Sequence, residues 1–193
     1  MLSIEAMQAQ LEASLPHKRY KHSLRVYETA LDMIKAHGFT GDLAERTAIA
    51  ALLHDCGRVV NSKGCLEKAK ELGVAYTPLE ANQPILFHAI FGPHYAEKDY
   101  GVTDPEILKA IRYHTTGGKD MSPMAKLVFL ADMIEPARDF PGVEELRDMS
   151  YKNLDEAMLM AYKNTIGYLT NSNLLIHPDC IAGYNQLLLA KLK

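Results

Sequence analysis

An apolar helical run that ends in a histidine and an aspartate constrains this chain more than any other part of its sequence. The run extends from Asp42 to His54 and is nearly all apolar after Arg46, which predicts a helix buried on most of its sides. Gly57 follows and ends the segment. Burying a polar group is costly unless it finds a partner. His54 and Asp55 should therefore meet other polar groups inside the fold, or a metal ion, for which both are good ligands.

Apolar residues at helical spacing recur along the whole chain and predict an all-α protein of about ten helices. No segment shows the alternation that is typical of a strand, and no internal repeat is present. The expected helices cover residues 3–14, 17–37, 42–54, 85–91, 94–100, 103–114, 124–134, 143–149, 153–169 and 178–189, with a short helix ending near residue 72 and another starting at residue 77.

Capping residues and prolines mark several of the expected helix ends. Asn61-Ser62 can cap the short helix that ends near residue 72. Residues 77–80 and 103–106 both have the pattern of a capping box, with proline in the first turn. Gly92-Pro93 is expected to turn the chain between two helical segments.

Length and composition predict one ordinary globular domain, residues 1–193, with a core at roughly 17–140 on which helices of 143–193 pack. The net charge of −3 argues against nucleic acid as a partner. No apolar run is long enough for a membrane span, and the N-terminus does not resemble a signal peptide. The three cysteines show no CxxC spacing. A cytoplasmic location is the natural interpretation.

Four further polar residues lie on or at the ends of helices that should be buried or amphipathic: His22, His88, His114 and Asp132. For a single histidine the ordinary interpretation is a hydrogen-bonded side chain at the edge of the core. Asp132 is harder to explain in that way, because aspartate is rarely buried without a partner. The remaining histidines are expected to be solvated at helix ends or in loops: His17, His37, His94 and His177.

The order of these residues resembles the HD-domain metal-dependent phosphohydrolase superfamily. In that superfamily a histidine, a His-Asp pair and a late aspartate surround a metal, and two intervening histidines mark the members that hold two metals. The flanking segments resemble the branch of bacterial symmetrical bis(5′-nucleosyl)-tetraphosphatases (the YqeK type). These segments are Lys21–Val26, Leu53–Arg58, Ile111–Gly117 and Leu130–Pro136, with Arg138 after them.

The resemblance implies two divalent transition-metal ions. His22, His54, Asp55 and Asp132 would hold one ion, while His88, His114 and a bridging Asp55 would hold the other. Mixed imidazole and carboxylate ligands favour iron, with manganese, nickel or zinc as alternatives, over magnesium. A hydroxide that bridges two such ions is a strong nucleophile at neutral pH.

Polyphosphate requires further positive charge, for which Arg25, Arg58 and Arg138 are the candidates because guanidinium groups bind phosphate oxygens in pairs. Arg25 lies three residues after His22 and shares its helix face. Several HD enzymes have a lysine where this chain has Arg58, which could stabilise charge but not donate a proton. Asp55 and Arg58 are therefore the expected catalytic residues. Hydroxyl and backbone groups of Thr115, Thr116 and Gly117 could also contact the substrate, or could simply end a helix.

The expected function is symmetrical hydrolysis of diadenosine tetraphosphate to two ADP by attack of the bridging hydroxide. One alternative is another HD-type nucleotide hydrolase, such as a mononucleotide or deoxynucleotide phosphatase. A second is a non-catalytic nucleotide-binding module that retains a metal. The sequence allows a homodimer but does not determine the oligomeric state.

Overall fold

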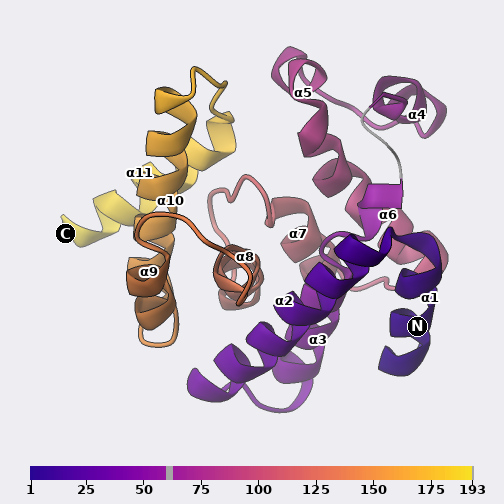
Figure 1. Cartoon of the computed structure of the whole chain (residues 1–193), viewed down its shortest axis with the longest axis horizontal. Coiled ribbons are helices and arrows are strands. Elements are labelled where there is room, and N and C mark those ends of the chain that lie inside the picture. Colours follow the sequence, from indigo (N-terminus) through magenta and orange to yellow (C-terminus); the bar gives the residue numbers. More distant parts are fainter. Residues whose placement is uncertain (60–62, 193) are drawn as a thin grey trace.

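The computed structural model describes residues 1–59 and 63–192, and Figure 1 shows that helices account for its architecture. This part of the chain contains no strand, which confirms the predicted all-α class. None of its helices has both the length and the apolar character needed to cross a membrane. The α-helices are α1 (Ile4–Ser14), α2 (His17–Ala36), α3 (Gly41–Leu53), α4 (Cys65–Glu71), α5 (Pro78–Asn82), α6 (Phe87–Tyr100), α7 (Pro105–Tyr113), α8 (Pro123–Ile134), α9 (Val143–Ser150), α10 (Leu154–Asn171) and α11 (Pro178–Lys191). Two 3₁₀ helices are η1 (Cys56–Val59) and η2 (Pro84–Leu86).

Four helices form the centre of the fold. Helices α2, α3 and α8 contact one another in pairs, and α7 packs against both α3 and α8. Every residue of α3 from Thr47 to Leu53 is buried, as its apolar run predicts. The C-terminal end of α3 therefore delivers His54 and Asp55 into the interior, where both are almost completely excluded from solvent.

The remaining helices extend the centre on two sides (Figure 1). On one side α9 and α10 both pack on α8, and α11 packs on α10. On the other side α6 packs on η1 and on α7, and brings His88 towards the centre. The division of the chain into a single domain stays a prediction.

Of the two predicted capping boxes, the structure contains one. Thr77 forms the expected capping box with Glu80, and Ser122 caps α8. The capping box expected at residues 103–106 is wrong, because Asp104 caps α7 by accepting hydrogen bonds from two backbone N–H groups. Asn61-Ser62 lies outside the described residues, and α4 begins after Gly64.

The turn expected at Gly92-Pro93 is also wrong, because α6 runs through both residues without interruption. The glycine serves close packing. A Cβ atom at Gly92 would lie 2.5 Å from the side chain of Ile111 on α7. From the other side, the buried Cys56 thiol donates a hydrogen bond to the Gly92 carbonyl oxygen at 3.3 Å. A glycine followed by proline thus marks a contact between helices here.

Three of the four histidines that were expected to be solvated are partly buried. His17 is exposed as predicted, whereas His37, His94 and His177 are half-buried. His177 lies in the loop before α11, as predicted, but it is not solvated. Its Nδ1 accepts a hydrogen bond from the Asp179 backbone and caps α11, and its Nε2 lies 3.5 Å from the buried Glu80 carboxylate.

Gly57 should not tolerate a side chain. A Cβ atom there would lie 2.1 Å from the His88 carbonyl oxygen and 2.8 Å from the Gly92 nitrogen. We expect Gly57→Ala to lower the free energy of unfolding by about 1–3 kcal/mol, because neighbouring backbone would have to move. Urea unfolding measures the effect.

Gly167→Ala is the matched control. Apart from its chain neighbours and the backbone of its own helix, no atom of the described residues lies within 4 Å of the position that its Cβ would take on α10. Alanine should therefore leave stability equal or raise it by about 0.5–1 kcal/mol. A Gly57→Ala protein as stable as the wild type would contradict the close approach of η1 and α6.

Candidate metal centre

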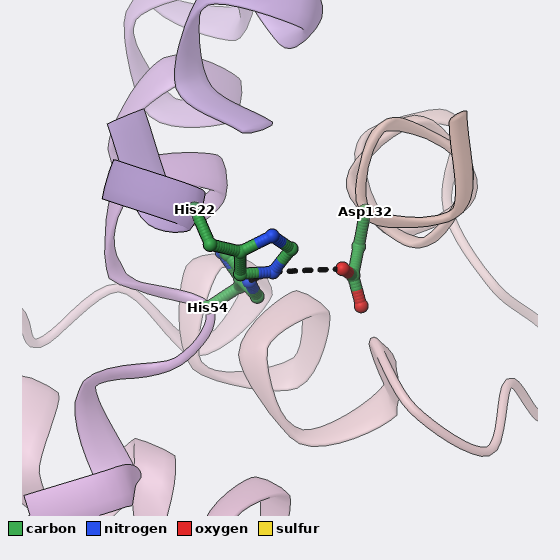
Figure 2. Close-up of side chains that lie close together, drawn as sticks. All are labelled: His22, His54 and Asp132. Atoms are coloured by element: carbon green, nitrogen blue, oxygen red, sulfur yellow. Dashed lines mark hydrogen bonds and ion pairs between the residues drawn. The ribbon is translucent and has the colours of Figure 1, made fainter. Parts of the chain in front are cut away.

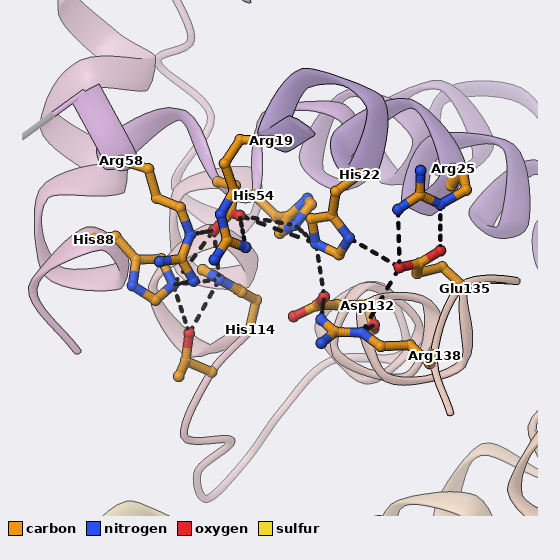
Figure 3. A network of polar contacts seen from close by, with 12 residues as sticks. Arg19, His22, Arg25, His54, Arg58, His88, His114, Asp132, Glu135 and Arg138 are labelled. Carbon is orange, nitrogen blue, oxygen red and sulfur yellow. Dashed lines mark hydrogen bonds and ion pairs between the residues drawn. The ribbon is translucent and has the colours of Figure 1, made fainter. Parts of the chain in front are cut away.

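The six predicted ligand residues come from five segments and meet at one place (Figure 3). His22 lies on α2, and Asp132 lies in the last turn of α8. His54 and His114 follow directly after α3 and α7, Asp55 precedes η1, and His88 lies in the first turn of α6. All are buried except Asp132, whose side chain is 16% exposed. That partial exposure places Asp132 at the edge of the cluster.

In each of the four histidines of the cluster, the Nδ1 atom lies at hydrogen-bond distance from an oxygen atom. His54 and His114 each direct Nδ1 at the carbonyl oxygen three residues earlier, at 2.7 Å. His88 does the same with Ile85, and His22 directs Nδ1 at Glu135 Oε1 at 3.1 Å. Because these oxygens only accept hydrogen bonds, Nδ1 must carry the proton and Nε2 a lone pair.

The four Nε2 lone pairs converge on one another. His22 Nε2 lies 3.3 Å from His54 Nε2, and His88 Nε2 lies 3.0 Å from His114 Nε2. Lone pairs in such proximity repel unless a cation lies between them. His22 Nε2 is also 3.1 Å from Asp132 Oδ1 (Figure 2). This donor set fits a transition-metal ion.

Asp55 lies between the two pairs of histidines. Its Oδ2 is 4.0 Å from His22 Nε2 and 3.9 Å from His54 Nε2. Its Oδ1 is 3.4 Å from His88 Nε2 and 3.6 Å from His114 Nε2. Oδ2 is buried and accepts no hydrogen bond from any described residue. A buried carboxylate oxygen without a hydrogen bond needs positive charge beside it, which here is the Arg19 guanidinium, with Nη1 3.5 Å from Oδ2, or a bound cation.

Within the described part of the chain, two sets of three residues could each hold an ion with ligand atoms within 4.8 Å of one another: His22, His54 and Asp132, and His54, Asp55 and His114. His88 adjoins the second set through the contacts of its Nε2 atom with His114 and Asp55. The chain therefore has His/Asp groups that could bind metal, arranged on both sides of Asp55.

The protonation states of these residues suit metal ligation. Burial lowers the pKa of His54 to about 4 and that of His88 to about 3, so both rings are neutral at pH 7. Burial raises the pKa of Asp55, but the surrounding histidines and Arg58 outweigh it and hold the pKa well below its usual range. The pKa of Asp132 is likewise lowered, since its contacts with His22 and with the Arg138 guanidinium outweigh burial. Neutral imidazoles beside ionised carboxylates are the forms that bind metals.

Arginines surround the cluster. Arg58 Nε donates to Asp55 Oδ1 at 2.6 Å, and Arg138 contacts Asp132 through Oδ1 and through its backbone oxygen. Arg19, which the sequence analysis missed, has Nη1 3.5 Å from Asp55 Oδ2. It lies three residues before His22 on α2, and this spacing could have revealed it.

Arg25 does not point into the cluster. It forms a bidentate ion pair with Glu135, with Nε 2.5 Å from Oε2 and Nη2 3.3 Å from Oε1. Glu135, a second residue that the sequence analysis missed, in turn accepts the Nδ1 hydrogen bond of His22. Burial raises the pKa of Glu135, but its hydrogen bonds from Arg25 and His22 outweigh burial and lower the pKa to about 2. Arg25 thus contacts the cluster through Glu135 and His22.

The segment after His114 divides into two parts. Thr115 Oγ1 lies 3.0 Å from Nε2 of both His88 and His114, so it belongs to the cluster. Thr116 and Gly117 are buried, and a Cβ atom at Gly117 would lie 2.3 Å from the Tyr162 hydroxyl. The Thr116 hydroxyl donates a hydrogen bond to the Gly117 carbonyl oxygen at 3.0 Å, and a role of either residue in substrate binding stays a prediction.

We expect Glu135→Ala to weaken metal binding about 10- to 100-fold, because the carboxylate orients His22. Glu135→Gln, which can still accept from His22 Nδ1, should lose less. Calorimetric titration with manganese measures the affinity, and Glu145→Ala, at an exposed position on α9, is the control. Unchanged affinity in Glu135→Ala would show that Glu135 does not orient His22.

The helices of this chain enclose a buried His/Asp cluster, and comparison with known sequences identifies the family to which the chain belongs. The chain belongs to the HD domain family, which matches residues 19–137. The symmetrical bis(5′-nucleosyl)-tetraphosphatase of Halalkalibacterium halodurans is 39% identical over 181 residues, 91% of each chain. The protein of the same name from Staphylococcus aureus is 34% identical over 189 residues, 95% of each chain.

A solved structure shares the whole fold. The crystal structure of a predicted HD superfamily hydrolase involved in NAD metabolism, from Clostridium acetobutylicum, superimposes with a TM-score of 0.90 and 33% sequence identity. The match covers 98% of this chain and 99% of the other. The similarity therefore extends to the helices outside the family match.

Proposed function

We propose that this chain is a metal-dependent hydrolase that cleaves diadenosine tetraphosphate symmetrically into two molecules of ADP. Relatives that carry the name symmetrical bis(5′-nucleosyl)-tetraphosphatase match it over nearly their whole length, which supports this activity. The observation that carries the proposal is the position of Asp55, whose two carboxylate oxygens face different pairs of histidines.

Two metal ions fit this arrangement. We assign His22, His54, Asp132 and Asp55 Oδ2 to one ion, and His88, His114 and Asp55 Oδ1 to the other. Imidazole and carboxylate ligands favour iron, and manganese, nickel and zinc are the other candidates. When bound, two such ions supply a water molecule of lowered pKa and neutralise charge on the phosphoryl oxygens.

The arginines have N–H groups left for the substrate. Arg58 uses Nε and Nη2 in its contacts with Asp55 and His88, so Nη1 remains. Arg138 uses Nε and Nη2 in its contacts with Asp132. Each guanidinium group thus lies beside a proposed ligand carboxylate and can also bind a phosphate oxygen. Arg19 is the third arginine of the site and, like Arg58, lies beside Asp55.

In the proposed reaction a water oxygen forms a bond to one β-phosphorus, and the bond from that phosphorus to the central bridging oxygen breaks. The bridging oxygen leaves with the second half, so both products are ADP. Arg58 stabilises the charge that develops on the phosphoryl oxygens. It does not protonate the leaving group, because arginine stays charged, and ADP departs as an anion.

We expect ADP to be the sole nucleotide product when the protein is incubated with diadenosine tetraphosphate and iron or manganese. In water enriched in oxygen-18, half of the ADP should carry one labelled oxygen on its β-phosphate. Chromatography and mass spectrometry measure both. AMP with ATP would mean asymmetric attack. Turnover only of mononucleotides or deoxynucleotides, with release of nucleoside from a monophosphate or of tripolyphosphate from a triphosphate, would favour another HD-type nucleotide hydrolase.

A further inference from the structure

A cavity of about 840 Å³ adjoins the metal centre. Met133 and residues 138–141, in the segment between α8 and α9, line one side. Six residues of α10 line the other side: Lys163, Asn164, Thr165, Gly167, Tyr168 and Asn171. Arg138 belongs to both sites, because it lines the cavity and contacts Asp132. A molecule that reached from the metal centre past Arg138 would therefore enter this cavity.

The lining of the cavity suits a heterocyclic base. Tyr168 is 65% exposed although it is large and aromatic, and Phe140 and Pro141 add further apolar surface. Asn164 and Asn171 supply amide groups that can both donate and accept hydrogen bonds. An aromatic face for stacking with a few polar groups for orientation is a common way to bind a base.

The charges of the cavity suit the phosphate end of a nucleotide. Arg138 and Lys163 outnumber the one acidic residue of the lining, Asp139. Arg138 lies at the boundary with the metal centre, where the phosphate chain would have to pass. The volume is within the usual range of small-molecule sites, about 300–1,000 Å³.

We propose that this cavity binds one nucleoside of the dinucleotide substrate, with the base stacked on Tyr168 and the adjoining phosphates reaching the metal centre past Arg138. The proposal rests on the proposed function for the identity of the substrate. It adds the site that distinguishes a nucleotide from a simple polyphosphate. The second nucleoside of the dinucleotide substrate would lie outside this cavity.

Binding of ADP and of inorganic pyrophosphate to the manganese-loaded protein tests the proposal. Calorimetry should show that Tyr168→Ala weakens ADP binding roughly tenfold or more, because stacking is lost, whereas pyrophosphate binding is unchanged. Tyr168→Phe keeps the ring and should bind ADP like the wild type. Tyr151→Ala, at another exposed tyrosine outside the cavity, is the matched control.

Two outcomes would overturn the proposal. Wild-type ADP affinity in Tyr168→Ala would place the nucleoside elsewhere, and equal losses for ADP and pyrophosphate would mean that the variant perturbs the metal centre instead. These measurements need no turnover. A protein that failed to hydrolyse diadenosine tetraphosphate but lost ADP affinity only in Tyr168→Ala would refute the proposed function and support the nucleoside site.

Discussion

Asp55→Asn is expected to lower turnover of diadenosine tetraphosphate by about a thousandfold or more. Asparagine has nearly the shape of aspartate but no charge, so the two proposed ions would lose the carboxylate that they share. Metal content should fall for both sites together, because Asp55 faces His22 and His54 with one oxygen and His88 and His114 with the other. Elemental analysis of the purified protein measures the stoichiometry, and product chromatography measures the rate.

Asp148→Asn removes the same charge at an exposed position on α9 and should leave turnover and metal content unchanged. Thermal unfolding of both variants shows whether the fold survives. A folded Asp55→Asn protein with wild-type turnover would contradict the role of Asp55 as a shared ligand.

The cluster could be predicted from the sequence because residues that bind metals occur along the chain in a recognisable order. An aspartate in the apolar helix α8 and a His-Asp pair after the buried helix α3 are costly to bury unless each has a hydrogen-bond, ion-pair or metal partner. The structure brings Asp132 and this pair together with His22, His88 and His114. Their roles as metal ligands stay predictions that metal analysis has to test.

Residues that support the cluster were harder to predict. Glu135 looks like an ordinary charged residue at a helix end, and only its three-dimensional neighbour His22 reveals its position. The spacing of Arg19 from His22 could have placed it on the correct helix face, but only the structure shows that it lies beside Asp55. Arg25 has the expected helical spacing from His22, but the spacing did not show that Glu135 would take up its guanidinium group. A helix face can be predicted from sequence, whereas the partner of a side chain on that face depends on packing.

The errors in the fold have the same cause. Local capping by Thr77 was predicted correctly, because the groups involved lie within a few residues. Gly92-Pro93 was taken for a turn, but Ile111 from another helix explains the glycine. His177 was expected to be solvated in a loop, and it does precede α11, but its side chain lies beside Glu80, far away in the sequence. Contacts between distant segments decided both cases.

His88→Ala should separate catalysis from binding. His88 Nε2 faces Asp55 Oδ1 and His114 Nε2 but not the His22 side of the cluster. We therefore expect loss of only the metal ion on that side. Turnover should fall by about a thousandfold or more, because attack and charge neutralisation both depend on the presence of two metal ions. Elemental analysis should find about half of the wild-type metal, in contrast to Asp55→Asn. His17→Ala, at an exposed histidine, is the control.

Nucleotide binding in His88→Ala then discriminates an enzyme from a binding module. If the chain is a hydrolase, ADP should still bind, more weakly, through the remaining ion and the arginines, while turnover is lost. Removing one ligand would then change the chemical step more than the affinity, as is expected when an interaction acts mainly in the transition state. A His88→Ala protein with full metal content and wild-type turnover would show that His88 is not a ligand. A wild-type protein that binds metal and ADP without any turnover would identify the binding module, because its affinity would then be the whole of its function.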